Sequence, residues 1–208
     1  MSVPQLTYSL PYAHLNLRRN PFGEFSADEQ AALALVDIDP IIARMNEPGY
    51  AVQFVGEKGY GKTTHLLAIR SRLSGAGYVH IPEGERAPVP LGCPLLIDEA
   101  QRLTQWQQFQ VFRSNTPLVL GTHRDFQQKL RRAGRVVETI EVEQRTDTER
   151  LHQLLNARIE WVRRCDGQVP SITITTADSL RQQYAANIRG ILHHLYTAFQ
   201  NLSEVTDL

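Results

Sequence analysis

Residues 51–64 read AVQFVGEKGYGKTT, an apolar run that leads directly into a glycine-rich loop. The octet at 56–63 has the form G-x-x-x-x-G-K-[ST], whose glycines let successive backbone N–H groups point toward a phosphate. The lysine of such an octet, here Lys62, reaches the β- and γ-phosphates, and the hydroxyl of Thr63 is a ligand for Mg²⁺. The stretch predicts a buried strand, a phosphate-binding loop and a helix, in the order that nucleotide binding requires.

We expect ATP, together with Mg²⁺, to bind along the whole loop. The predicted ATP-binding residues are Gly56, Glu57, Lys58, Gly59, Tyr60, Gly61, Lys62, Thr63 and Thr64. The alternative is a glycine turn that precedes lysine by chance, which arises in a chain of this length at a frequency on the order of 1%. GTP is disfavoured because the sequence contains no Asn-Lys-x-Asp or Thr-Lys-x-Asp base-reading motif.

An acidic pair, Asp98 and Glu99, directly follows the apolar run 95–97. An acid at the carboxyl end of a parallel strand lies beside the phosphate loop, so we predict that Asp98 holds Mg²⁺ through its hydration shell. The neighbouring carboxylate, Glu99, is then placed to orient and deprotonate the attacking water. The alternative for the pair is an exposed acidic start of a helix.

A polar triplet, Gly121, Thr122 and His123, ends the apolar run 118–120. We expect this run to form the strand between the loop strand and the acidic strand, so a side chain at its end can hydrogen-bond the water or the γ-phosphate. Thr122 is the first candidate and His123 the second. The alternative for Thr122 is a helix N-cap.

Apolar periodicity and turn residues predict an α/β fold, a parallel sheet sandwiched by helices. The expected strands are 51–55, 78–81, 95–97, 118–120 and 136–142, and the expected helices between them are 62–73, 103–113 and 125–132. Ser26 with Glu29 forms a capping box, and Asp39 before Pro40 opens a second short helix. Apolar residues at helical spacing over 151–162 and 188–202 predict a small C-terminal helical subdomain.

We therefore expect a helical preface (1–50), an ATPase core (51–144) and a helical lid (145–208). The 208 residues carry 22 basic and 22 acidic side chains, so net charge predicts neither a nucleic-acid nor a membrane partner. Two cysteines are too few for a disulfide framework, which favours a cytoplasmic location. We find no run of apolar residues long enough to insert into a membrane.

With these residues in place, the sequence resembles the AAA+ P-loop ATPases, and is most similar to the bacterial ExeA, TniB and TnsC type of transposition and secretion ATPases. The resemblance rests on Asn-Pro-Phe at 20–22, the glycine loop at 56–64, Leu-Leu-Ile-Asp-Glu-Ala-Gln at 95–101, Gly-Thr-His at 121–123 and Ala-Asn-Ile-Arg-Gly at 186–190. It implies an AAA+-like fold with a lid, Thr122 as the first sensor and Arg189 as the lid arginine called sensor 2. The alternative for Arg189 is a solvated helix residue.

The sequence departs from the family pattern between the second strand and the acidic strand. Only 13 residues separate Ile81 from Leu95, and they include four prolines, so we expect an extended connector instead of a crossover helix. The chain also has no room after the lid for an added partner-binding module, so the partner function of those relatives is not implied.

A basic stretch runs from 124 to 135 and ends the helix before the fifth strand. In AAA+ relatives this neighbourhood faces the next subunit and supplies an arginine finger; Arg132 is the first choice, Arg131 the second, and Arg135 a further alternative. The stretch could instead contact a DNA backbone or form a solvated helix end.

These observations predict an ATPase whose hydrolysis moves the lid and changes self-association. A slow ATP-dependent switch that recruits a DNA or protein partner is the second hypothesis. A P-loop kinase is the third and fits less well, because the adjacent acidic pair and the helical C-terminus are typical of an ATPase. The expected partners are ATP, further copies of the chain and an unidentified protein, with DNA as an alternative.

Overall fold

The chain consists of two compact units in the computed structural model, which describes residues 11–142, 147–185 and 187–208. The sheet unit is Phe25–Thr146, and the helical unit combines Met1–Glu24 with Asp147–Leu208. The sheet unit carries the glycine loop and the acidic pair, so it is the unit that positions the predicted site.

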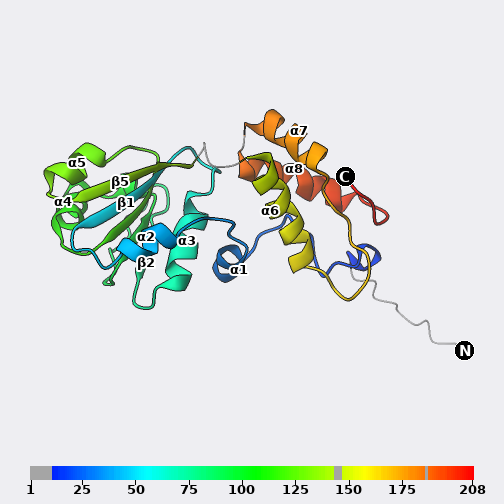
Figure 1. The fold of residues 1–208 in the computed structure, drawn as a ribbon, viewed down its shortest axis with the longest axis horizontal. Helices are drawn as coiled ribbons and strands as arrows, with labels where there is room; N and C mark the ends of the chain where they lie inside the picture. Colours follow the sequence, from blue (N-terminus) through cyan, green and yellow to red (C-terminus); the bar gives the residue numbers. More distant parts are fainter. Residues whose placement is uncertain (1–10, 143–146, 186) are drawn as a thin grey trace, which may run out of the picture. The chain divides into compact units, whose positions relative to one another are not determined.

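A five-stranded parallel sheet, in the order β2-β3-β4-β1-β5, forms the centre of the sheet unit (Figure 1). Its strands are β1 (Tyr50–Val55), β2 (Gly77–His80), β3 (Leu95–Asp98), β4 (Leu118–Thr122) and β5 (Val136–Glu141). β4 lies between β1 and β3, as expected, so the ends of the loop strand, the polar triplet and the acidic strand are neighbours at the carboxyl edge of the sheet.

Helices cover both faces of the sheet, which confirms the predicted α/β P-loop fold. They are α1 (Ala27–Ala32), α2 (Asp39–Arg44), α3 (Lys62–Arg72), the 3-10 turn η2 (Ala100–Arg102), α4 (Gln105–Arg113) and α5 (Gln127–Arg132). Side chains alternate across β1, so Val52 and Phe54 pack under α2 and α3 while Ala51 packs toward α4 and α5. The three inner strands, β1, β3 and β4, are mostly apolar because both of their faces are buried.

The predicted capping box of α1 is present, because the Ser26 hydroxyl accepts a hydrogen bond from Glu29 N and the Glu29 carboxylate accepts one from Ser26 N. α2 begins at Asp39, as expected. The connector at 82–94 is extended and forms no helix, which also agrees with the sequence. It returns close to the start of β2, where Cys93 N donates to the carbonyl of Gly75 over 2.9 Å.

The helical unit contains the 3-10 turn η1 (Ala13–Leu15), α6 (Thr148–Trp161), α7 (Ile174–Tyr184) and α8 (Ile188–Gln200). α6 and α8 match the predicted apolar periodicity, and Ile191, Leu195 and Phe199 of α8 are buried. α7 was not predicted. Its sequence opens with the β-branched run Ile-Thr-Thr, and the structure begins it with Thr173, whose hydroxyl accepts a hydrogen bond from Thr176 N.

Residues 11–24 pack within the helical unit. The guanidinium of Arg158, which is buried in α6, donates to the carbonyl oxygens of Pro21 at 3.0 Å and Gly23 at 2.9 Å. The ring of Phe22 meets Phe199 edge-on at a centroid distance of 4.9 Å. Residues 11–24 and 25–50 thus pack in different units, and the division into preface, core and lid stays a prediction about independent domains.

Candidate nucleotide-binding site

The glycine loop joins the end of β1 to the start of α3. Gly59 and Gly61 have φ angles of 99° and 90°, left-handed values that other residues adopt only with strain. Gly61 is the N-cap of α3, and Lys62 is the first residue of that helix. The loop therefore ends at the positive end of a helix, which is the arrangement that binds phosphate in other proteins.

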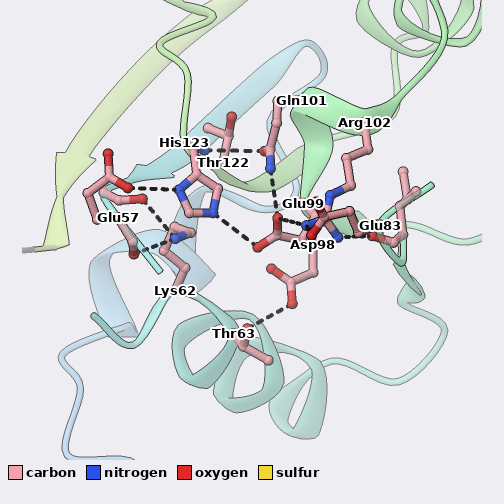
Figure 2. A network of polar contacts seen from close by, with 12 residues as sticks. Glu57, Lys62, Thr63, Glu83, Asp98, Glu99, Gln101, Arg102, Thr122 and His123 are labelled. Atoms are coloured by element: carbon pink, nitrogen blue, oxygen red, sulfur yellow. Dashed lines mark hydrogen bonds and ion pairs between the residues drawn. The ribbon is translucent and has the colours of Figure 1, made fainter. Parts of the chain in front are cut away.

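Lys62 lies inside this loop and is only 4% exposed. Its ammonium donates to the carbonyl oxygens of Gly56 and Glu57 over 2.8 and 2.7 Å. These contacts hold the positive charge above the loop, where it can exchange a carbonyl oxygen for a more negative phosphate oxygen. Figure 2 shows Lys62 beside Glu57 in the glycine loop, and its role toward phosphate stays a prediction.

Asp98 ends β3 and is fully buried. Its Oδ2 accepts a hydrogen bond from the Thr63 hydroxyl over 2.8 Å and lies 3.0 Å from Nδ1 of His80, at the end of β2. Its Oδ1 is buried and has no hydrogen-bond partner among the described residues. A buried carboxylate oxygen without a donor is costly unless a ligand completes it.

The donor set formed by Thr63 and Asp98 fits Mg²⁺. Both supply oxygen atoms, and Mg²⁺ is commonly bound by one or two protein oxygens together with phosphate and water. Within the described residues, His, Cys, Asp and Glu side chains gather nowhere in groups of three or more that could hold a metal by themselves. The phosphate groups of a nucleotide would thus have to supply part of the coordination.

Gly121 of β4 makes the position of Asp98 possible. A Cβ atom at Gly121 would lie 2.7 Å from Oδ1 of Asp98, closer than a carbon and an oxygen can pack. The absence of a side chain on β4 therefore lets the carboxylate of the neighbouring strand reach across the carboxyl edge of the sheet.

Glu99 has a left-handed backbone conformation, with φ of 63°, and its carboxylate is held by three side chains. Oε2 accepts from Nε2 of Gln101 over 2.7 Å and lies 3.2 Å from the guanidinium of Arg102, while Oε1 lies 3.4 Å from Nε2 of His123. Burial acts to raise the pKa of Glu99, but the Gln101 hydrogen bond and the charges of His123 and Arg102 outweigh it, so the pKa lies below its ordinary value. Glu99 is thus ionised at neutral pH, as a base that accepts a proton from water must be.

Thr122 and His123 are placed differently by the turn that follows β4. The buried hydroxyl of Thr122 donates to Arg124 O over 2.9 Å and accepts from Arg124 N over 3.0 Å, so it stabilises the turn. The imidazole of His123 lies between Glu57, at 3.6 Å, and Glu99, at 3.4 Å (Figure 2). His123, the second candidate at this strand end, is therefore the one that contacts the loop and the predicted base.

Three residues of this network were missed by sequence reasoning: His80, Gln101 and Arg102. Arg102 also donates to the carbonyl of Ile81 over 2.7 Å and lies 3.6 Å from Glu83, so it ties Glu99 to the start of the connector. A signal existed for Gln101 and Arg102, because residues two and three positions after Glu99 can fold back on its side chain in a tight turn. For His80 the only signal was its place at the end of a strand.

The basic residues before β5 lie in two different environments, one exposed and one buried. Arg131 and Arg132 are exposed at the end of α5, as expected for a surface contact. Arg135 is 5% exposed and donates to the carbonyl oxygens of five residues, so the suggestion that it is an exposed finger is wrong. Burial lowers the pKa of Arg135 to about 10, which leaves it charged at neutral pH.

Arg132 lies near the amino-terminal ends of the parallel strands, whereas the glycine loop lies at their carboxyl ends. The strand after it pairs Val136 with Tyr50, at the start of β1, whereas the loop follows the end of that six-residue strand. At about 3.3 Å per residue the two positions are about 17 Å apart along the strand. Arg189 is an exposed residue in the first turn of α8 and belongs to the helical unit.

The fold is shared with solved structures. The chain matches the RuvB Holliday junction branch migration motor of Thermotoga maritima with a TM-score of 0.52 and 16% sequence identity, over 83% of this chain and 60% of that one. The chain thus spans less than two thirds of that protein, and at this identity the match shows a shared fold alone. No family model matches the sequence, and no curated protein matches it. Among the described helices, none combines the length and the apolar character that a bilayer span needs.

Proposed function

We propose that the chain binds ATP with Mg²⁺ and hydrolyses it. The observation that carries this proposal is the meeting of four groups at the carboxyl edge of one parallel sheet: the Lys62 ammonium in the glycine loop, the linked Thr63 and Asp98, and the ionised Glu99. The AAA+ fold of the chain supports it. If the glycine turn were only structural, there would be no reason for the buried Asp98 carboxylate beside it to keep one oxygen without a hydrogen-bond donor.

In this proposal the loop N–H groups and Lys62 bind the β- and γ-phosphates, and Lys62 stabilises the charge that spreads over the transferring group. Thr63 and Asp98 would hold Mg²⁺, which would supply positive charge against the phosphate oxygens. Glu99 accepts a proton from water while the water oxygen bonds to the γ-phosphorus and the bond to the β–γ bridging oxygen breaks, which gives ADP and phosphate. His123 holds the Glu99 carboxylate in place.

The test separates binding from turnover. Glu99→Gln removes the base and keeps the size of the side chain, so it should bind radiolabelled ATP like the parent protein and release phosphate at least about a hundredfold more slowly. Glu47→Gln changes an exposed carboxylate of the same unit and is the matched control. Parental phosphate release by Glu99→Gln would remove Glu99 as the base.

A slow switch is the second candidate function, and the contacts of Glu99 favour it specifically. Gln101 and Arg102 hold Oε2, so the carboxylate must exchange a protein partner for water before it can act. Such an enzyme turns over slowly until a DNA or protein partner rearranges these contacts. Phosphate release measured with and without nonspecific DNA tests the form of the switch that responds to DNA, because stimulation by DNA is expected only for that form.

We further propose that Arg132 acts on the nucleotide of a neighbouring copy. Its position at the opposite edge of the sheet supports a role in trans, since it lies too far from its own loop. A head-to-tail contact of this kind builds rings or filaments, so activity should rise with protein concentration. Mixing Arg132→Ala with Lys62→Ala should restore some hydrolysis, because mixed interfaces pair an intact loop with an intact arginine. Two inactive variants that stay inactive in assemblies confirmed by light scattering would exclude the trans arginine.

Arg189 is proposed to contact the γ-phosphate and so to couple nucleotide to movement of the lid. A guanidinium matches phosphate oxygens and loses that contact after hydrolysis. Arg189→Ala should therefore keep its fold but show equal protease sensitivity with and without ATP. Clear protection of the variant's helical unit by ATP would argue for a solvated residue instead.

A further inference from the structure

The groove between α4 and α5 is a second concave surface of the sheet unit. The two helices lie side by side on one face of the sheet (Figure 1), and a hollow of about 310 Å³ opens between them. Phe109 and Phe112 of α4 and Ala133 after α5 give it an apolar lining. We call this surface the α4–α5 groove; its size suits one large apolar side chain and its neighbours.

Three cations surround the hollow: Arg113 on α4, and Lys129 and Arg132 on α5. Neither helix contains an acidic residue, and within the described residues no carboxylate forms an ion pair with any of the three. The remaining lining residues are glutamines. The groove is therefore apolar at its base and positive at its rim, which is complementary to an anionic ligand that carries an apolar group.

Arg135 fixes the two walls of the groove to each other. Its backbone follows α5, and its buried guanidinium donates to the carbonyl oxygens of Phe112 over 2.8 Å and Val111 over 3.0 Å at the end of α4. It also donates to Thr116 O over 2.8 Å. A groove whose walls are joined by a buried cation is preformed, so a ligand loses little free energy in ordering it.

The hollow beside the aromatic side chains of α4 favours a peptide over a nucleic acid. Trp106 stacks on Phe109 at a centroid distance of 5.8 Å and an interplanar angle of 13°, and the guanidinium carbon of Arg113 lies 4.6 Å from the centre of the Phe109 ring. Trp106 and Arg113 thus lie against the Phe109 ring, while Phe109 stays 50% and Trp106 66% exposed. Single-stranded nucleic acid binds by stacking bases on open aromatic faces, whereas an inserted side chain needs the hollow that is present here.

We propose that the α4–α5 groove docks an acidic protein segment, which inserts one bulky apolar side chain between the helices and places flanking carboxylates on Arg113, Lys129 and Arg132. This docking does not rest on nucleotide hydrolysis. One consequence does rest on the proposed function: a seated segment covers Arg132 and competes with the neighbouring copy for it, so it would lower assembly-dependent hydrolysis.

The test uses the full chain and fluorescein-labelled peptides in an anisotropy titration. Three nine-residue acidic peptides, with leucine, phenylalanine or tryptophan at the centre, are compared with versions that have a central serine or lysines in place of the acids. At least one acidic peptide should bind, at least about tenfold more tightly than its serine and lysine versions, and more weakly as salt is added.

Variants of the protein locate the binding. Lys129→Glu and Phe109→Ser should each weaken the acidic peptide at least tenfold, whereas Arg131→Glu, on the same helix but outside the hollow, should change it less than threefold. Thermal melting shows whether each variant is folded. Lys62→Ala should leave peptide binding unchanged, so failure of the nucleotide site and failure of this proposal are distinguishable.

Three results would overturn the proposal: no binding by any acidic peptide, equal binding by the lysine versions, or equal weakening by Arg131→Glu. Displacement of the peptide by oligo-dT at lower concentration than by unlabelled peptide would assign the groove to nucleic acid. Displacement by a second copy of the chain, seen as self-association that Phe109→Ser abolishes, would assign it to self-assembly.

Discussion

The carboxyl edge of the sheet and the α4–α5 groove both concentrate charge, but they satisfy it differently. At the carboxyl edge Lys62 is held by loop carbonyls, and Glu99 is held by Gln101, Arg102 and His123. Around the groove, no described carboxylate pairs with Arg113 or its neighbours. A ligand at the first region must exchange contacts with charged groups and backbone carbonyls, whereas an anionic ligand at the second meets cations that contact Gln108 and aromatic rings.

This difference indicates which region should be more selective for its ligand. Exchange of partners is favourable only for a ligand whose charge and shape exceed what the carbonyls and side chains offer, as a triphosphate with Mg²⁺ does. Addition of contacts to exposed cations is less demanding, and it depends on salt because exposed charges are screened. Substitutions at the two regions sharpen the comparison, and we expect the largest effect at the carboxyl edge.

Removal of the metal ligand should give this largest effect. Asp98→Asn keeps the shape of the side chain but lowers the charge that holds Mg²⁺, so phosphate release should fall at least about a hundredfold, as it should for the parent protein in EDTA. Asp39→Asn, an exposed aspartate of the same unit, should be as active as the parent protein. Equal activity of Asp98→Asn at saturating ATP would contradict the metal role.

Loss of the buried cation should give the next effect, on folding instead of turnover. Arg135→Met leaves several carbonyl oxygens at the end of α4 without a donor, so the free energy of unfolding should fall by about 3 kcal/mol. Arg131→Met changes an exposed neighbour and should stay within about 0.5 kcal/mol of the parent protein. Urea unfolding measures both, and equal stability of the two variants would refute the bracing role of Arg135.

A methyl group at Gly121 should disturb the metal site although both predicted ligands, Thr63 and Asp98, are kept. The added Cβ would lie 2.7 Å from Oδ1 of Asp98, so the carboxylate must move. We expect Gly121→Ala to need about tenfold more Mg²⁺ for half-maximal phosphate release, since each tenfold change corresponds to about 1.4 kcal/mol. A Mg²⁺ titration is the measurement, and an unchanged midpoint would show that Asp98 Oδ1 does not take part.

The smallest effects are expected from substitutions of His123 and Thr122. The first should lower turnover, and the second should lower stability. His123→Ala removes a contact to Glu99 and should lower kcat about tenfold with little change in KM for ATP. Thr122→Val removes the turn hydrogen bonds to Arg124 and should lower the free energy of unfolding by about 1 kcal/mol. If Thr122→Val lowers kcat more than His123→Ala does, Thr122 is the sensor, as the family resemblance implies.

Local patterns explain how much of this could be predicted from the sequence. The glycine loop, the acidic strand and the capping box are contiguous motifs, and each appears where its own residues predicted it. The position of β4 between β1 and β3 also followed from the motifs, because their functional ends must meet.

The contacts that could not be predicted join residues that are distant in the sequence. His80 meets Asp98 from another strand, and His123 meets Glu57 across the loop, so each depends on the pairing of strands. Arg135 looked like one more surface cation, because burial of a charge is decided by carbonyl oxygens that no sequence pattern displays. α7 was missed because β-branched residues weaken the helical signal at its start.

The most direct test of nucleotide binding at the carboxyl edge is a calorimetric titration of ATP with Mg²⁺ into the parent protein, Lys62→Ala and Lys129→Ala. We expect one site per chain in the parent protein and in Lys129→Ala, which loses a cation at the groove, and at least about hundredfold weaker binding in Lys62→Ala. Equal affinity of Lys62→Ala, or no binding of millimolar ATP by the folded parent protein, would contradict the assignment of this edge to Mg-ATP.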